Sequence, residues 1–164
     1  MDAPLPRVPR IAYLLGFAGL LPQLATLLAV AAARWRGEGA HMAGLGVVFV
    51  GMLYPLLILS FLGGIWWGFA MRRDREQGRL ALLAVVPSLA ALALLGLAAA
   101  TGHAGWSLVA IGCAVILTLP VDRRLARAGD APEGWMRLRV PLSLGLGGAT
   151  ILLGALVGGP VSRF

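Results

Sequence analysis

The stretch "SFLGGIWWGFAMRR" (Ser60–Arg73) closes a long run of apolar residues and ends at two arginines. It combines glycines, which allow helices to approach closely, with two tryptophans about one and a half turns before the first arginine. An apolar run that ends in aromatic residues and positive charge is typical of a helix reaching the headgroup region of a bilayer. The stretch therefore predicts a transmembrane helix.

The composition of the whole chain agrees with this prediction. Of 164 residues, 59% are hydrophobic and only 13% are charged, more apolar surface than a soluble domain of this size can bury. The net charge of +7 comes with arginines at the ends of apolar runs, so it indicates membrane topology and not nucleic-acid binding. The single cysteine, Cys113, excludes a disulfide framework and is interpreted as a small core residue.

Five apolar runs are each near the length of about 20 residues that crosses a bilayer. They cover residues 11–33, 43–71, 80–100, 104–119 and 140–159, and a long basic loop occupies 121–139. The predicted fold class is all-α: an integral membrane bundle of five transmembrane helices, forming one domain over residues 1–164.

The arginines predict the orientation of this bundle. Five crossings place eleven arginines on one side of the membrane and three on the other. By the positive-inside rule the N-terminus is then cytoplasmic and the C-terminus periplasmic, in the inner membrane of a bacterium. The short run 104–119 could instead be re-entrant, but the arginine bias would then vanish. The first run is too long for the apolar core of a signal peptide.

Small residues suggest where helices pack. At 100° per residue, Ser60, Gly64 and Gly68 share one stripe of their helix, and a second stripe of small residues lies on the last helix (Ser143, Gly147, Gly154 and Gly158). We expect both stripes to be packing seams against other helices, the first either within the bundle or on a partner. Trp66, on the opposite side from the first stripe, is expected to face lipid as an interfacial anchor. Pro22, Pro55 and Pro87 are expected to permit kinks.

No Asp, Glu, Arg or His occurs within any of the five predicted spans. Ion-coupled transport and intramembrane haem or metal binding usually need such residues, so we expect no catalytic residues, no metal and no cofactor. Ser60 and Ser88 lie at depth without a base to activate them. His41 and His103 are interpreted as loop histidines, with a shared surface metal or haem site as the alternative.

Several aromatic and polar residues remain as candidate ligand or partner contacts: Tyr54, Trp67, Ser88, Asp122, Trp135, Arg137 and Arg139. Asp122 and the Arg137–Arg139 pair flank the long basic loop. They are interpreted as an ionic tether between two helix ends, and alternatively as a clamp for a phosphate or lipid headgroup.

Four segments carry a family resemblance. "LGFAGLLPQ" (Leu15–Gln23), "YPLLILSFLGGIWWGFA" (Tyr54–Ala70), "VVPSLAA" (Val85–Ala91) and "APEGWMRLRVPLSLG" (Ala131–Gly145) occur in this order over most of the chain. In this the chain resembles the transmembrane protein 69-like family, a bacterial and mitochondrial domain of unknown function. The resemblance implies a small inner-membrane helical protein and no established activity. Members of that family often carry histidine where Trp66 stands here.

The expected function is a non-catalytic one. We expect an accessory, assembly or stabilising subunit of membrane protein complexes, with membrane lipids and other membrane subunits or a second copy as partners, and no nucleic acid. The alternative is a binder or carrier of an apolar ligand such as a quinone, a lipid or a tetrapyrrole. A small transporter or a membrane enzyme is the third interpretation.

Overall fold

A computed structural model describes residues 7–38, 43–73 and 76–158 of the chain. Within these ranges the regular elements are all α-helices. Five helical segments are long and apolar enough to cross a membrane: 10–35, 45–70, 77–101, 104–127 and 135–158. The predicted fold class, an all-helical bundle with five potential spans, is confirmed.

Seven helices make up the five segments, because the first and fourth segments are each interrupted once. The helices are α1 (Arg10–Ala18), α2 (Leu21–Trp35), α3 (Leu45–Ala70), α4 (Gln77–Thr101), α5 (Ala104–Leu117), α6 (Leu119–Arg127) and α7 (Trp135–Gly158). The fourth segment extends well beyond the predicted end at residue 119, and the fifth begins before residue 140. The predicted loop 121–139 is therefore much shorter, and Asp122 and Arg139 lie in helices.

The first segment breaks at Gly19 and Leu20, just before Pro22. Proline has no N–H to bond the carbonyl four residues earlier, and its ring crowds that carbonyl, so a helix bends or breaks there. α3 and α4 remain continuous through Pro55 and Pro87. The break gives α1 a direction of its own relative to α2, and this matters for the cavity described below.

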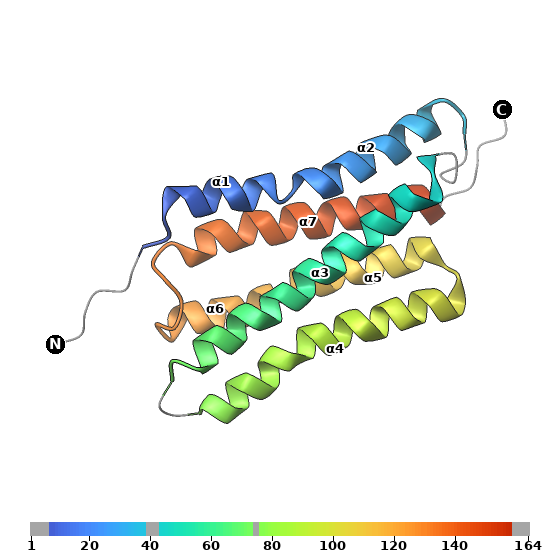
Figure 1. The fold of residues 1–164 in the computed structure, drawn as a ribbon. Coiled ribbons are helices and arrows are strands. Elements are labelled where there is room, and N and C mark those ends of the chain that lie inside the picture. Colours follow the sequence, from blue (N-terminus) through green and yellow to red (C-terminus); the bar gives the residue numbers. More distant parts are fainter. Residues whose placement is uncertain (1–6, 39–42, 74–75, 159–164) are drawn as a thin grey trace.

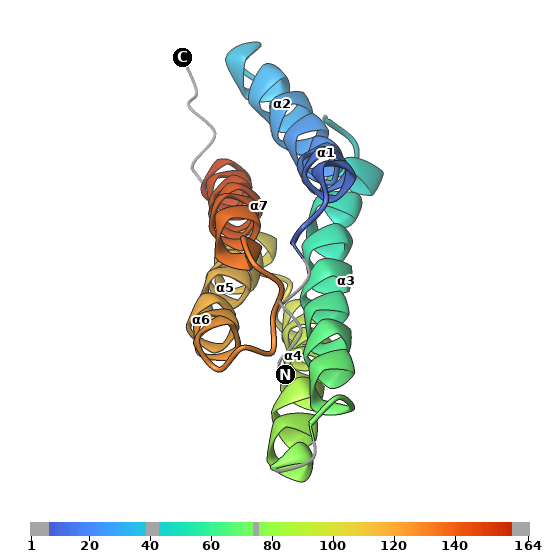
Figure 2. The ribbon, with the colours of Figure 1, turned by 90° about the vertical axis from the view of Figure 1, so that its left-hand side faces the viewer.

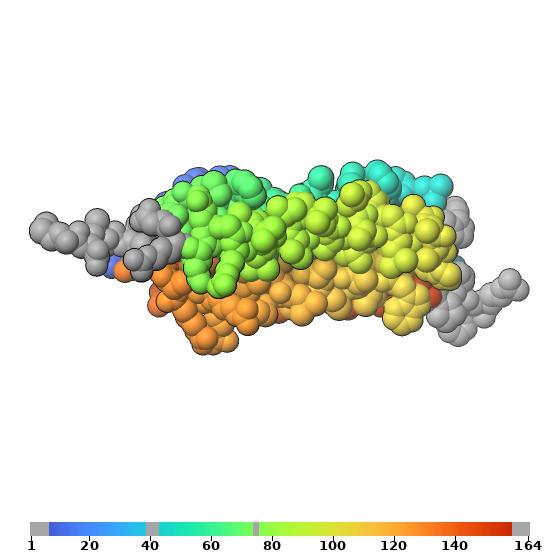
Figure 3. Space-filling view, turned by 90° about the horizontal axis from the view of Figure 1, so that it is seen from below, coloured from blue at the N-terminus to red at the C-terminus, as the bar shows by residue number. Residues whose placement is uncertain are grey.

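The segments run up and down the bundle as two layers (Figures 1 and 2). One layer contains α7, α5 and α6; the other contains the α1–α2 segment, α3 and α4 (Figure 2). The space-filling view shows an elongated body in which α4 and the α5–α6 segment lie side by side (Figure 3). The starts of α1, α4 and α7 and the ends of α3 and α6, which carry most of the arginines, gather at one end (Figure 1).

Glycines permit the closest helix contacts. A Cβ atom added to Gly112 of α5 would lie 2.6 Å from the carbonyl oxygen of Gly147, and one added to Gly154 of α7 would lie 2.6 Å from that of Gly105. Gly158 also faces Gly105. In the other layer, Gly63 of α3 lies directly against the backbone of α4. These backbones approach so closely that no larger side chain fits between them.

Two sequence-based expectations are wrong, and a third is narrowed. Gly64 and Gly68 do not contact another helix of the described chain, because a Cβ atom at either would meet nothing within 4 Å; within the bundle Gly63 makes the close approach, and a seam at Gly64 and Gly68 against a partner stays a prediction. Trp66 does not face lipid but is only 3% exposed. Cys113 is exposed and is no core residue. Since α3 is apolar on every side, hydrophobic periodicity could not distinguish its inner face from its outer face.

Candidate functional site

A buried ionic cluster joins three helices at the arginine-rich end of the bundle. Arg139 of α7 and Asp122 of α6 are 5% and 0% exposed, and the Arg139 Nε donates to Asp122 Oδ2 at 2.9 Å. Trp66 of α3 donates from Nε1 to the other carboxylate oxygen at 2.9 Å. Asp122 therefore receives a donor on each oxygen, as a buried carboxylate requires. The ionic tether predicted between Asp122 and the arginine pair exists, through Arg139; Arg137 is exposed.

The participation of Trp66 in this cluster was missed by sequence reasoning. Adjacent tryptophans in an apolar run gave no indication of which one faces inward. Asp122 is the residue from which this contact could have been predicted, because a lone acidic side chain near an apolar helix needs hydrogen-bond donors once it is buried. An indole N–H is such a donor.

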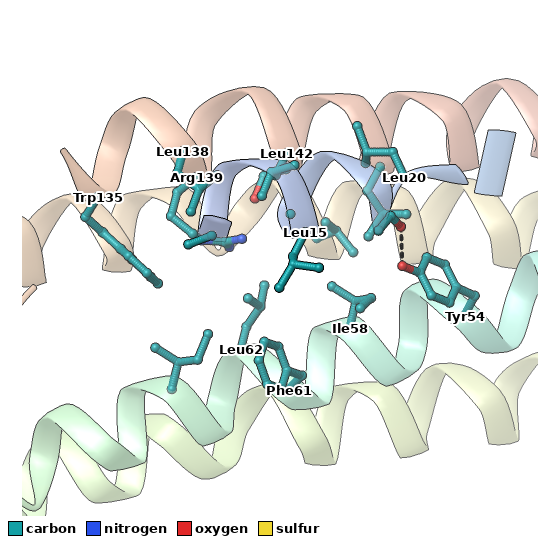
Figure 4. Close-up of a pocket in the computed structure, with 17 residues that line it drawn as sticks. Leu15, Leu20, Tyr54, Ile58, Phe61, Leu62, Trp135, Leu138, Arg139 and Leu142 are labelled. Atoms are coloured by element: carbon teal, nitrogen blue, oxygen red, sulfur yellow. Dashed lines mark hydrogen bonds between the residues drawn. The ribbon is translucent and has the colours of Figure 1, made fainter. Parts of the chain in front are cut away.

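Beside this cluster lies a cavity of about 460 Å³, bordered by α1 and the break after it, by α3 and α7, and by one residue of α5 (Figure 4). Its lining is mostly aliphatic and aromatic. The lining residues are Ala12, Leu15, Gly16, Gly19, Leu20, Tyr54, Ile58, Phe61, Leu62, Ile65, Val115, Trp135, Leu138, Arg139, Leu142, Ser143 and Leu146.

The cavity opens sideways between α1 and α3. Leu15 of α1 and Phe61 of α3 line it and are 66% and 63% exposed, whereas Leu62, Val115 and Leu146 are buried. The exposed pair therefore forms the rim and the buried residues form the floor. In a membrane, such an opening would face lipid chains and not water.

The α7 wall of the cavity combines three leucines with three residues that carry polar groups. Trp135, Arg139 and Ser143 follow one another at intervals of four residues and so share one face of the helix. Figure 4 shows Trp135 and Arg139 extending from α7 toward α3. The Trp135 Nε1 and Ser143 Oγ atoms are buried and have no hydrogen-bond partner within the described chain. Buried polar atoms normally have partners, so these two unpaired atoms distinguish the α7 wall from the apolar rest of the lining.

Tyr54 has a structural task at the opposite end of the cavity. Its hydroxyl donates to the Gly19 carbonyl, at the break between α1 and α2 (Figure 4). This bond fastens the break to α3, and α2 beyond it also packs on α3, where Gln23 Nε2 donates to the Gly51 carbonyl at 3.2 Å. α1, before the break, packs mainly on α7, so space is left between α1 and α3.

The connection between α6 and α7 is held in place by several polar contacts. Arg73, just after α3, pairs with Asp130, and its Nε donates to Oδ1 at 2.8 Å. Arg7 pairs with Glu133 at 3.0 Å, and the Tyr13 hydroxyl donates to the Gly134 carbonyl. The hydrogen bond to Asp130 raises the pKa of the Arg73 guanidinium above its usual value. These contacts fix the start of α7 and hence the position of Trp135.

The other sequence-predicted residues lie away from the cavity. Trp67 is on the exposed side of α3. Ser88 of α4 and Ser60 of α3 form a hydrogen bond with an Oγ–Oγ distance of 2.9 Å. His103 precedes α5, and His41 lies outside the described residues. Within the described ranges, no three His, Cys, Asp or Glu side chains are grouped so that they could hold a metal ion.

Comparison with known proteins identifies a family without an assigned activity. Residues 8–156 match the family model described as "Protein of unknown function (DUF3429)". Because the match covers most of the chain, the protein belongs to this uncharacterised family. No curated protein and no solved structure gave a match.

Proposed function

We propose that this protein is a non-catalytic membrane protein that binds an apolar ligand in the cavity between α1, α3 and α7. The observation that carries the proposal is an apolar cavity whose lining residues Trp135 and Ser143 hold buried polar atoms that have no partner within the described chain. Irregular packing of membrane helices can leave small voids, but a void in an apolar bundle does not need a wall with unpaired hydrogen-bonding groups. A ligand that is mostly apolar and carries polar atoms would satisfy both features.

Size and access support the same proposal. Ligand sites in proteins have volumes of about 300–1,000 Å³, and are lined by apolar residues with a few polar groups that orient the ligand. The cavity, at about 460 Å³, is within this range. Its rim at Leu15 and Phe61 gives a lipid-soluble molecule a path from the membrane without crossing water.

The proposal is tested by filling the cavity. Ala12 is a small lining residue of α1, and Ala18 is an exposed residue of the same helix that does not line the cavity. Native mass spectrometry of the protein, gently extracted with its own lipids, should detect a bound small molecule. Ala12→Phe should abolish this adduct and Ala18→Phe should retain it. The absence of an adduct, or equal adducts in both variants, would contradict the proposal.

A second function, association with another membrane protein, is favoured by the outer side of α3. Gly64 and Gly68 leave a smooth, open strip on this side, on which a helix of a partner or of a second copy could pack closely. This is the accessory-subunit function expected from the sequence. If it is correct, Gly64→Leu should remove copurifying protein without unfolding the chain, whereas Gly148→Leu, at an open position on α7, should not.

We also propose that the bundle lies in a bacterial inner membrane with its arginine-rich end in the cytoplasm. The gathering of ten described arginines at one end supports this orientation, because positive residues are retained on the cytoplasmic side. Resemblance to the transmembrane protein 69-like family supports the same localisation. A topology reporter fused after residue 164 should behave as periplasmic and one inserted at residues 74–75 as cytoplasmic; the reverse result would contradict the orientation.

A further inference from the structure

We infer that the cavity recognises an uncharged molecule through its carbonyl oxygens, which accept hydrogen bonds from the α7 wall. This inference rests on the proposed function and specifies the class of ligand. A quinone and an acylglycerol both combine such oxygens with an apolar body. The chemistry they share is a carbonyl group on a lipid-soluble molecule without net charge.

The donors on the wall determine this polarity. An indole N–H can only donate, and a guanidinium likewise carries only donors, so Trp135 and Arg139 can form hydrogen bonds only with acceptor atoms. Arg139 Nε and Nη2 already donate to Asp122 and Thr118, which leaves Nη1 for a further acceptor. Ser143 can donate or accept, is 1% exposed, and has no partner in the described chain. Three residues of the α7 stripe that carry donor groups therefore line the cavity. The ligand group that complements them is an acceptor.

The charge balance of the wall favours a neutral ligand. Arg139 already pairs with Asp122 at 2.9 Å, and that carboxylate is completely buried beside it. The pair is neutral overall, so it leaves no positive charge to compensate a buried carboxylate or phosphate. Placing an unpaired anion in this apolar space would be costly. A carbonyl oxygen needs only the donors and brings no such cost.

The spacing of the wall also suggests that the ligand lies along α7. Positions four residues apart are separated by about 6 Å along a helix axis, so Trp135 and Ser143 are about 12 Å apart along α7. The opposite wall, formed by residues of α1 and α3 such as Leu15, Ile58 and Phe61, is apolar along the same length. The cavity thus has one polar edge and one apolar edge, which fits an elongated molecule with oxygens along one side.

The inference is tested with a matched series of probes that differ only in their polar group. Decylbenzoquinone carries carbonyl oxygens, decylbenzene carries no polar atoms, and decylbenzoate carries an anion. Dioctanoylglycerol supplies ester carbonyls as the second source of the same chemistry. The full chain is placed in nanodiscs of ether-linked phospholipids, which lack ester carbonyls and so do not compete. Binding is measured by titration with each probe and native mass spectrometry.

The expected result is a dependence on the donors that is specific to carbonyl probes. Trp135→Phe and Ser143→Ala should each weaken binding of decylbenzoquinone, of dioctanoylglycerol or of both about three- to tenfold, the usual effect of one hydrogen bond. Neither variant should change the affinity for decylbenzene. Donor dependence for only one of the two carbonyl probes would identify the source, and dependence for both would identify the carbonyl group itself.

Two outcomes would overturn the inference. The first is that Trp135→Phe and Ser143→Ala change the affinity for decylbenzene as much as the affinity for the carbonyl probes, or change no affinity at all. The second is that decylbenzoate binds more tightly than the uncharged probes. Ser143→Ala removes a hydroxyl that has no partner in the described chain, so it should fold normally and keep the test valid if Trp135→Phe does not fold. The two proposals can fail separately. If the carbonyl inference fails but decylbenzene binds and Ala12→Phe abolishes that binding, the proposed function of the cavity is still supported.

Discussion

The two sides of α7 differ in how closely their neighbours approach. Toward α5, Gly147 and Gly154 bring the backbones so near that an added methyl group would collide with a carbonyl oxygen. Toward α1 and α3, Trp135 and Ser143 border a cavity and keep polar atoms without partners in the described chain. One helix therefore serves for tight packing on one side and for an open site on the other. The close packing of α7 on α5 holds in place the face of α7 that borders the cavity.

Arg139 connects the two sides. Its Nε pairs with Asp122, which is in turn bonded to Trp66 of α3, while the same side chain lines the cavity. The ionic cluster thus ties α3, α6 and α7 together directly beside the proposed binding wall. Changes in the cluster should affect stability most, and changes on the cavity wall should affect it least.

The largest effect is expected from Asp122→Ala. Arg139 would keep a buried charge without a counterion, and Trp66 would lose its acceptor, so the variant should lose about 3–5 kcal/mol of stability. The control is Glu133→Ala, which breaks the exposed ion pair with Arg7 and should cost no more than about 1 kcal/mol. Unfolding of the detergent-solubilised variants by heat or denaturant measures both. If both variants lost the same free energy of unfolding, the buried cluster would contribute no more to stability than the exposed ion pair.

The next largest effect is expected from Gly147→Ala on the tight side of α7. The new Cβ atom would lie 2.6 Å from Ile116 Cγ1 and 2.7 Å from the Gly112 carbonyl oxygen. Forcing the helices apart should cost about 1–3 kcal/mol. The neighbouring Gly148 meets nothing within 4 Å, so Gly148→Ala should be neutral or stabilise by up to about 1 kcal/mol, since alanine favours the helix. The same unfolding measurement compares the pair, and a harmful Gly148→Ala would show that α7 is packed differently.

These neighbouring glycines also show how far the sequence determines the structure. The lengths of the apolar runs and the arginines at their ends were enough to predict five helical segments, because the bilayer thickness sets the length of a span. In the last helix the pattern Gly147, Gly154 and Gly158 also marked the side that faces α5. In α3 the same reasoning selected Gly64 and not Gly63, since every face of that helix is apolar and small residues occur on several of them.

The cavity was beyond sequence reasoning for a different reason. Tyr54, Trp135 and Arg139 were among the candidate contacts, but nothing in their spacing indicated that they line one space. The space depends on how far α1, the helix before the break at Gly19, lies from α3. This distance follows from packing over the whole bundle. A pattern along one helix reports which residues share a face, and it does not report how far away the neighbouring helix is.

An effect of similar size is expected from Trp66→Leu, for which Trp67→Leu is the control. Trp66 is buried and donates to Asp122, whereas Trp67 is on the exposed side of α3. Loss of the buried indole and its hydrogen bond should cost about 1–3 kcal/mol, and loss of the exposed one less than about 0.5 kcal/mol. Unfolding of the two variants in one detergent gives the difference. If Trp67→Leu were the more harmful change, Trp66 would face lipid, as the sequence predicted, and α3 would present a different face to the bundle.

The smallest effect, and the most specific to the cavity, is expected from Ser143→Ala. Ser60 and Ser143 are both serines in transmembrane segments, but Ser60 shares a hydrogen bond with Ser88 and Ser143 has no partner in the described chain. Ser60→Ala should therefore cost about 0.5–1.5 kcal/mol, the net value of one hydrogen bond. Ser143→Ala should leave the stability of the ligand-free protein unchanged or raise it slightly, because it removes a buried hydroxyl that gains nothing from the fold.

Measured again with a bound carbonyl ligand, Ser143→Ala should become the destabilising change, since the wild-type hydroxyl would then have its partner. A loss of stability without ligand as large as that of Ser60→Ala would mean that the Ser143 hydroxyl is already bonded within the protein, and the polar wall of the cavity would lose one of its free groups.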